Sequence, residues 1–356
     1  MVIYLVAISF RDLLRRIEWR CFEEYVSNEQ RMFIDDAVFS VQKSHMFRDS
    51  IRNIPEVEKR IKSVSPDIIL DSLRKLSSGR VVGVDGTISI YPTPVGYRCR
   101  IGVVAVNYLG ERVGEALYVS DLEFIDEGLN DITELLRNIE ELCKFTPLLY
   151  KCLMMYKERE LVLNRSEEWK VIHGPIVPLE MRLGRLGVEN VLEENIKLAE
   201  RLVMHKKIIG VLSSTRRLRL LNLGYLLKPG EYMRVASVGK LMRSEKRRLT
   251  REEESLIDGF IENYGDALVT GIYKASGKAY VFESHRDYFD EAAGLIIADS
   301  LNNRTKGFPF LIDYADKVCH SLFSSEEFKS RFEQALLSAE GEEAFMSFDE
   351  RRMRWS

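Results

Sequence analysis

Asp85 is the side chain in this sequence around which chemistry can most readily be built. It closes the valine-rich run 81–84 and precedes Gly86, a pattern that predicts a buried strand that stops at Asp85 and turns. A carboxylate at the end of a buried strand is costly unless a positive group meets it. The expected partner is a divalent metal held by oxygen ligands. The alternative is that Asp85 only stabilises a tight turn, because Asp-Gly is a common hairpin turn.

His173 stands in a similar position after a second predicted strand. The predicted buried strand 169–172 ends at His173, which is followed by Gly174 and Pro175. Two strands that each end in a polar residue and a glycine resemble one another in design. If they are neighbours in one sheet, Asp85 and His173 meet at one edge.

A helix predicted over 148–164 offers a third polar group. Residues at spacings of three and four form one stripe of this helix, and they are Leu149, Leu153, Tyr156, Glu160 and Leu163. Glu160 is therefore the single acid on an otherwise apolar, inward-looking face, whereas Glu158 falls on the other side. An acid on such a face usually has a partner inside. The alternative places Glu160 at the solvent-exposed end of its helix.

Asp316 lies on a later helix that is predicted to start at Pro309. Ile312, Asp316 and His320 follow one another at intervals of four residues and so share one face. Asp316 and His320 are both candidate metal ligands.

Two basic clusters could bind phosphate. A third predicted strand, 208–212, runs into a polar turn that contains Arg216, Arg217 and Arg219. The second cluster precedes the acidic run 252–254 and consists of Lys240, Arg243, Lys246, Arg247, Arg248 and Arg251. Guanidinium groups grip phosphate oxygens in bidentate fashion. The alternative for the second cluster is a solvated helix face with alternating charges.

The elements that must position these residues alternate between helical and extended patterns. An amphipathic helix is predicted over 9–35. Extended segments separated by turn residues follow from residue 81 and predict an antiparallel meander. Beyond it we expect the strands 169–172 and 208–212, a hairpin across Ser276-Gly277, and the helices 129–144, 148–164, 189–207 and 290–302.

The composition is that of a globular protein rather than a disordered or membrane chain. The sequence has 356 residues, of which 46% are hydrophobic and 30% charged, with a formal net charge of −3. The apolar run 2–8 has no basic residue before it and is closed by Arg11, so we expect neither a secretory signal nor a membrane span. The five cysteines form no C-x-x-C pair, which favours a reducing cytoplasm over a zinc site or a disulfide framework.

The motifs, taken in order, resemble those of the NurA nucleases. The resemblance spans roughly 81–320 and rests on five features. These are V-x-V-D-G-[ST] around Asp85, an acid on a later helix, x-G-P-[LI]-V starting at His173, a strand that enters a basic turn, and the late segment 307–316, which begins G-[FY]-P-x-L. Nucleases of this family partner the hexameric DNA translocase HerA in DNA end resection.

The resemblance implies an α/β fold with an RNase H-like mixed sheet flanked by helices. Residues 1–80 would form an N-terminal helical extension, 81–322 the nuclease domain, and 323–356 a C-terminal helix and basic tail. It also implies a nuclease that uses Mn²⁺ or Mg²⁺ and acts on DNA ends and single-stranded DNA. A homodimer and a HerA-like ATPase partner would follow, with no role for a membrane.

The resemblance assigns the site residues with two departures. Asp85 matches the first aspartate of the family and Glu160 its helical glutamate. The family has aspartate where this chain has His173, and histidine where it has Asp316. One hypothesis is a swapped ligand set, in which Asp85, Glu160, His173 and Asp316 still enclose a metal.

Two other hypotheses differ from an active nuclease. Drift of the metal ligands would leave a catalytically weakened relative that serves as a DNA-binding or regulatory subunit. A structural interaction protein, assembled through its amphipathic ends, would leave the arginine turn at 216–219 unexplained.

Overall fold

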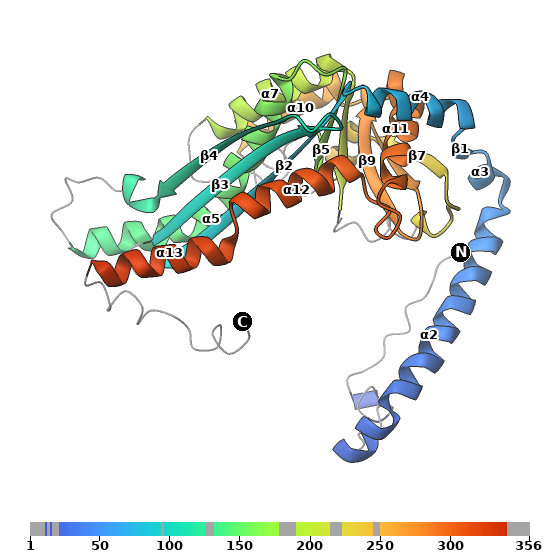
Figure 1. The fold of residues 1–356 in the computed structure, drawn as a ribbon, viewed down its shortest axis with the longest axis horizontal. Helices are drawn as coiled ribbons and strands as arrows, with labels where there is room; N and C mark the ends of the chain where they lie inside the picture. Colours follow the sequence, from blue (N-terminus) through green and yellow to red (C-terminus); the bar gives the residue numbers. More distant parts are fainter. Residues whose placement is uncertain are drawn as a thin grey trace. The chain divides into compact units, whose positions relative to one another are not determined.

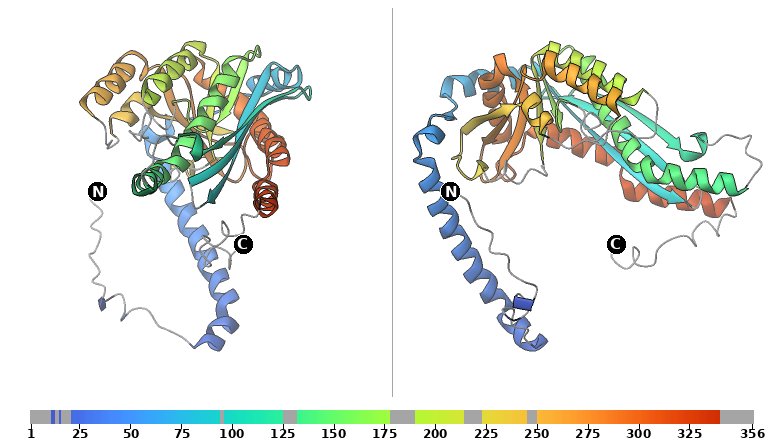
Figure 2. Two further views of the ribbon diagram at one scale, coloured as in Figure 1. Left: turned by 90° about the vertical axis from the view of Figure 1, so that its left-hand side faces the viewer. Right: turned by 180° about the vertical axis from the view of Figure 1, so that it is seen from behind.

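The structure is a computed structural model, shown in Figures 1 and 2. It describes residues 11–12, 15, 21–93, 96–124, 132–177, 190–213, 223–244 and 250–339. The chain divides into two compact units, residues 1–58 and residues 59–356. The predicted N-terminal extension reached residue 80, and residues 59–80 lie in the second unit.

The first unit contains a long helix. Helix α2 runs from Phe22 to Arg52 and is followed by the short helix α3, Pro55–Glu58. The amphipathic pattern predicted a helix over 9–35, whereas α2 begins later and continues further. Many apolar side chains of α2 are exposed, among them Phe22, Phe33, Val38, Phe39 and Met46.

The second unit is built on one mixed sheet. Its described part has nine strands in the order β1-β7-β8-β9-β6-β5-β2-β3-β4. The strands are β1 Ile61–Ser63, β2 Val81–Thr93, β3 Gly96–Asn107, β4 Arg112–Ser120, β5 Trp169–His173, β6 Ile208–Leu212, β7 Glu231–Ser237, β8 Leu268–Lys274 and β9 Ala279–His285. Strands β2, β5 and β6 are parallel to one another, and the remaining neighbours are antiparallel.

Helices cover both faces of this sheet (Figures 1 and 2). One face packs against α4 Pro66–Ser77, α11 Phe289–Leu301 and α12 Phe310–Leu322. The other packs against α5 Ile132–Leu163, α7 Val191–His205, α9 Val238–Arg243 and α10 Arg251–Tyr264. Helix α13, Ser325–Ser338, adds aromatic contacts to β2 and β4. The predicted mixed sheet flanked by helices is confirmed.

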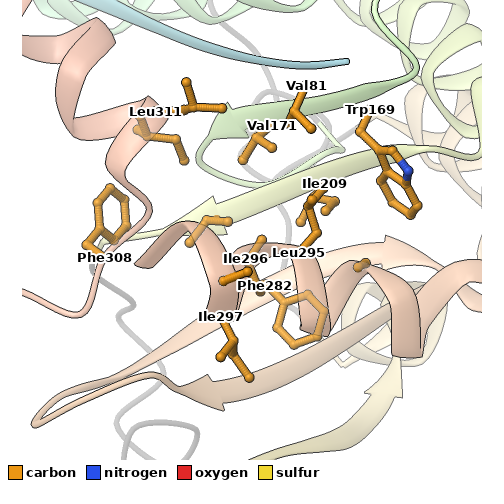
Figure 3. Close-up of a cluster of buried hydrophobic side chains, with 14 of the residues drawn as sticks. Val81, Trp169, Val171, Ile209, Phe282, Leu295, Ile296, Ile297, Phe308 and Leu311 are labelled. Carbon is orange, nitrogen blue, oxygen red and sulfur yellow. The ribbon is translucent and has the colours of Figure 1, made fainter. Parts of the chain in front are cut away.

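The core follows from the alternation of side chains along buried strands. Val81 of β2 belongs to the cluster beneath α11 and α12 (Figure 3), whereas Val82 and Val84 belong to the cluster beneath α5 and α7. Helix α12 approaches β2 so closely that a Cβ atom on Gly83 would come within 2.6 Å of Leu311 Cβ. The glycine therefore permits the close contact between α12 and the first residues of β2.

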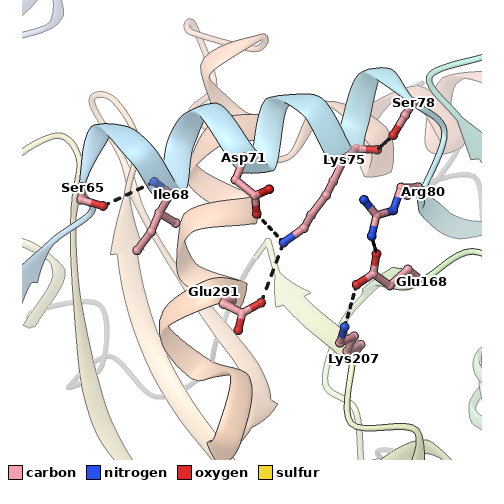
Figure 4. Close-up of polar contacts among 9 residues, drawn as sticks. All are labelled: Ser65, Ile68, Asp71, Lys75, Ser78, Arg80, Glu168, Lys207 and Glu291. Atoms are coloured by element: carbon pink, nitrogen blue, oxygen red, sulfur yellow. Dashed lines mark hydrogen bonds and ion pairs between the residues drawn. The ribbon is translucent and has the colours of Figure 1, made fainter.

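Polar contacts fasten α4 to its neighbours (Figure 4). Ser65 caps the helix by accepting a hydrogen bond from the backbone N–H of Ile68. Lys75 Nζ lies 2.5 Å from an oxygen of Asp71 and 3.8 Å from one of Glu291 on α11. Glu168, just before β5, in turn joins Arg80 to Lys207. These contacts tie α4 to α11 and the start of β2 to the segments that lead into β5 and β6.

Two predictions about local structure are wrong. The chain does not turn at Asp85-Gly86, because β2 continues to Thr93 and stays paired with β3 throughout. The strand that ends there is β5, whose parallel pairing with β2 stops beside Val84. The helices predicted over 129–144 and 148–164 form the single helix α5, which contains Pro147.

Among the residues that the structure describes, no helix is long and apolar enough to cross a membrane.

Candidate active site

Asp85 and His173 meet where β5 ends beside β2. The parallel register pairs Val84 with Ile172, so the next residues, Asp85 and His173, are neighbours. His173 Nδ1 lies 3.1 Å from Asp85 Oδ1, and its Nε2 lies 2.8 Å from Ser213 Oγ. The backbone N–H of Gly86 also donates to Asp85 Oδ1, at 2.8 Å. Asp85 is thus held at two points although only 3% of it is exposed.

When protonated, the imidazole of His173 is a positive partner for the carboxyl groups of Asp85, Glu158 and Asp316. Burial alone would lower its pKa. The hydrogen bond to Asp85 and the negative charges of Asp85, Glu158 and Asp316 outweigh burial and raise the pKa of His173 above its usual value. The protonated imidazole can donate from both nitrogens, to Asp85 and to Ser213.

Glu158 supplies the second buried carboxyl group of the site. It comes from α5, on the face of the sheet opposite to α12, and is 2% exposed. Its Oε1 lies against Gly86, where an added Cβ atom would come within 2.8 Å of it. Burial, and after it the charge of Asp85, raises the pKa of Glu158 to about 8. Two acids are therefore brought together where both cannot ionise easily at neutral pH.

Arg159 partly offsets this accumulation of negative charge. Its Nη1 lies 3.5 Å from Glu158 Oε2, and its side chain is fully buried. The same guanidinium donates to the carbonyl oxygens of Met155, at 2.7 Å, and of Pro175 and Ile176. It therefore ties α5 to the chain that follows β5, and lowers the pKa of Glu158 against the effect of burial.

The structure places Glu160 away from this group. Its side chain is 35% exposed and lies 2.6 Å from Lys157 Nζ. Leu153, on the same predicted stripe, is also exposed. Helix α5 packs against both the sheet and α7, so buried positions extend around much of its circumference. The spacing of apolar residues therefore did not identify the buried face of α5. Glu158 occupies the inward position that the prediction gave to Glu160.

Asp316 faces the same cleft from α12. The cleft has a volume of about 290 Å³ and is lined by Asp85, His173, Ser213, Lys278, Tyr280, Lys306, Phe308, Ile312, Asp313 and Asp316. Burial, and then the charge of Asp85, raises the pKa of Asp316, whereas His173 and His320 lower it. His320 is exposed one turn further along α12 and does not line the cleft. The structure thus brings Asp85, His173 and Asp316 to one cleft.

Several polar residues at this cleft were not predicted from the sequence. Ser213 directly follows the end of β6, and His173 is the last residue of β5. Because parallel strands end at the same side of a sheet, Ser213 could have been predicted to lie near His173. Lys278 and Lys306 enter from the turns before β9 and α12. Lys306 pairs with Asp313, whereas Lys278 Nζ lies 5.0 Å from the centre of the Tyr280 ring.

The predicted nucleic-acid contacts lie outside the described residues. These are Arg216, Arg217 and Arg219 of the first cluster and Lys246, Arg247 and Arg248 of the second. Their assignment remains a prediction.

The chemistry of the carboxyl groups suits a hard divalent cation. In the described ranges, no three His, Cys, Asp or Glu side chains are grouped closely enough to form a ready metal site. Asp85, Glu158 and Asp316 nevertheless offer the oxygen donors that Mn²⁺ and Mg²⁺ prefer. The pKa values of Glu158 and Asp316 are raised in part by the charge of Asp85. A bound cation would relieve that repulsion, so the donor chemistry of these residues fits such an ion; Asp85 and Asp316 line one cleft, and Glu158 approaches from the other face of the sheet.

Comparison with known proteins concerns the fold. No family model and no curated protein sequence match this chain. The structure is similar to that of the NurA nuclease from Sulfolobus solfataricus, with a TM-score of 0.53 and 11% identity over 90% of this chain and 98% of that one. A second NurA structure has a TM-score of 0.47 and 10% identity over 87% of this chain and 97% of that one. A third, of NurA bound to dAMP and manganese, has a TM-score of 0.46 and 10% identity over 90% of this chain and 98% of that one. The chain therefore has a NurA-like, RNase H-like fold, as predicted.

Proposed function

We propose that this protein is a nuclease that hydrolyses phosphodiester bonds with the help of a divalent cation, Mn²⁺ or Mg²⁺. The observation that carries the proposal is the pair of buried carboxyl groups, Asp85 and Glu158, at the point where β5 ends. Both are almost inaccessible, and the charge of Asp85 helps to raise the pKa of Glu158 to about 8. Proteins maintain such costly groupings of acids mainly at functional sites. The NurA-like fold supports the same conclusion.

Asp85, Glu158 and Asp316 would hold the cation. When bound, the cation lowers the pKa of a water molecule and neutralises charge on the phosphate. His173 keeps the Asp85 carboxylate oriented through Nδ1 and anchors itself on Ser213 through Nε2. Its part is therefore to position Asp85.

The cationic wall of the cleft would bind the substrate strand. Lys278 and Lys306 line the same cleft as Asp85. Ammonium groups at this place can contact phosphate oxygens and position the strand without reading its bases. Lys278 is the better candidate, because Lys306 is already paired with Asp313.

The finer assignment rests on the sequence motifs together with the fold. We propose DNA ends and single-stranded DNA as substrates, and DNA end resection and repair as the process. The partner would be a HerA-like hexameric translocase, and the protein would act as a homodimer. The order of motifs from Asp85 to Asp316 and the NurA-like fold support this proposal.

The direct test is cleavage of labelled single-stranded DNA. We expect the purified protein to shorten the substrate with Mn²⁺ or Mg²⁺ and to leave it intact with EDTA. Asp85→Asn should abolish cleavage while circular dichroism and the unfolding transition show a folded protein. Robust cleavage by Asp85→Asn would contradict the assignment of the site.

One observation favours a second function, a DNA-binding or regulatory subunit with little catalysis. His173 already gives Asp85 a partner within the chain that is positive when protonated. An aspartate at position 173 would instead add negative charge beside Asp85, and a metal ion would then be needed to balance it. An inactive wild-type protein that gains cleavage in the double variant His173→Asp, Asp316→His would support this alternative. Activity of the wild type would exclude it.

A further inference from the structure

A wide basic groove lies at the edge of the sheet opposite to the candidate active site. It has a volume of about 720 Å³ and lies where β7 and β9 end and β8 begins. Strand β9 pairs with β6 in antiparallel fashion, so Val281 is opposite Leu212 and Ser284 is opposite Ile209. The active-site cleft is at the Leu212 end of β6, and the groove is at the other end. A ligand in this groove is therefore separate from the reacting phosphate.

The groove concentrates positive charge in a protein with a formal net charge of −3. Its cationic lining residues are Lys59, Arg60, Lys62, Arg234 and Arg286. The two acids that line it are Asp266 and Asp290, of which Asp290 lies 2.8 Å from Lys62 Nζ. Arg286 has only a distant, exposed partner, 3.7 Å away in Asp287. Lys59, Arg60 and Arg234 form no ion pair with any carboxylate in the described ranges.

Arg234 is fixed in position before any ligand arrives. Its guanidinium lies 4.8 Å from the centre of the Phe289 ring, and Nη2 donates to the backbone carbonyl of Arg286 at 3.4 Å. The pairing of β7 with β8 shifts register between Arg234 and Ala236. Irregularities of this kind redirect side chains at sheet edges. A guanidinium held in this way loses little entropy on binding an anion.

We propose that this groove binds the sugar–phosphate backbone of a single nucleic-acid strand outside the active-site cleft. The cations come from three segments, around residues 59–62, 234 and 286, so they suit a series of phosphates better than one small anion. The aromatic rings of the groove, Tyr232 and Phe289, are buried and leave no face on which a base could stack. Binding is therefore independent of base sequence.

Two further exposed cations follow the groove residues in the sequence. Ser237, in the groove wall, is followed by Lys240 and Arg243 on α9, both exposed. These two residues begin the second basic cluster of the sequence. The inference rests on the proposed function only in taking nucleic acid, among polyanions, as the ligand.

The test measures binding of a fluorescent deoxythymidine oligonucleotide by anisotropy in EDTA, so that cleavage plays no part. The groove variant combines Lys59→Gln, Arg60→Gln and Arg286→Gln. The matched control combines Lys197→Gln, Lys329→Gln and Arg331→Gln, three exposed cations elsewhere. We expect the groove variant to raise Kd at low salt about 10-fold and to reduce the slope of log K against log salt by about 2, as each lost phosphate contact contributes about 0.7. The control should stay within about twofold of the wild type.

A second measurement locates the strand. Bound oligonucleotide should protect Lys59, but not Lys197, from acetylation as read by mass spectrometry. Equal Kd, equal salt slope and no protection of Lys59 would overturn the inference. Loss of tripolyphosphate binding in the groove variant, with oligonucleotide binding unchanged, would also overturn it, because the site would then take a small anion. A protein that binds through the groove but cleaves nothing would refute the proposed nuclease and leave the groove assigned.

Discussion

Glu158 and Gly86 lie in direct contact, and this contact brings the second acid of the site beside Asp85. The carboxylate reaches the backbone of β2 from α5 because position 86 has no side chain. Asp85, one residue earlier, faces the side covered by α12, where Asp316 stands. Acids from both faces of the sheet thus converge at the point where the neighbouring strand ends.

The two glutamates of α5 make a matched pair for mutation. We expect Glu158→Gln to lower the rate of metal-dependent cleavage by about 100-fold or more, because it removes a charge that would hold the cation. Glu160→Gln should stay within about twofold of the wild type, since Glu160 pairs with Lys157 at the surface. Single-turnover cleavage of labelled DNA measures both. Equal losses in the two variants would contradict the placement of Glu158.

Adding one methyl group at position 86 tests the contact itself. In Gly86→Ala the new Cβ would meet Glu158 Oε1 at 2.8 Å and Met154 Cγ at 2.9 Å. Both are side-chain atoms that can move, and the third neighbour, the backbone oxygen of Gly102, is at 3.1 Å. We therefore expect a folded protein that is less stable by about 1–3 kcal/mol and has largely lost cleavage. Gly259→Ala is the control, because a Cβ atom there meets open space. It should keep its activity and gain up to about 1 kcal/mol from the helix propensity of alanine.

Replacing His173 by aspartate tests whether its charge stands in for a cation. His173→Asp exchanges a positive partner of Asp85 for a third acid beside Asp85 and Glu158. We expect a lower melting temperature than the wild type in EDTA, and a larger increase of that temperature when Mn²⁺ is added, because binding to the folded state stabilises it. Thermal unfolding with and without Mn²⁺ provides the comparison. Identical Mn²⁺-induced shifts in the two proteins would refute this role of His173.

Asp299 should make folding stability depend on pH. It is buried on α11, accepts hydrogen bonds from the Tyr108 hydroxyl at 2.6 Å and from the Leu311 N–H at 3.1 Å, and burial raises its pKa to about 6. Because the folded pKa exceeds the unfolded one, this residue stabilises the fold below about pH 4, and that stabilisation is lost as the pH rises through 6. The loss amounts to roughly 2–3 kcal/mol.

The measurement compares the wild type with Asp299→Asn by urea unfolding from pH 4 to pH 7. The amide does not titrate. The free energy of unfolding of the wild type, relative to that of the variant, should therefore fall by roughly 2–3 kcal/mol between pH 4 and pH 7. Other titrating groups cancel in the difference. A difference that stays constant with pH would show that Asp299 is not held in its protonated form by burial.

Strands β5 and β6 could be predicted from the sequence because each is a short, buried run that ends at a polar residue. Placing β5 beside β2 then yielded the meeting of Asp85 and His173. The helical acid could not be predicted in the same way. Helix α5 packs against the sheet on one side and α7 on another, so apolar spacing alone did not distinguish the face of Glu158 from that of Glu160.

The turn at Asp85 shows a second limit of sequence patterns. Asp-Gly is favourable in a hairpin turn, yet β3 pairs with β2 along its whole length and keeps it extended. Long-range pairing of this kind leaves no local signal. The functional position was set by the end of a different strand, β5, which no residue near Asp85 reveals.

The buried guanidinium of Arg159 has a consequence for how this protein matures. Together with the imidazole of His173, it gives the acids of the site counter-charges that belong to the polypeptide itself. We therefore expect the chain to fold without added metal, and we expect chelators to stop the proposed cleavage without making the protein sensitive to proteases. On the proposed function, newly made protein is folded but inactive until it binds the ion.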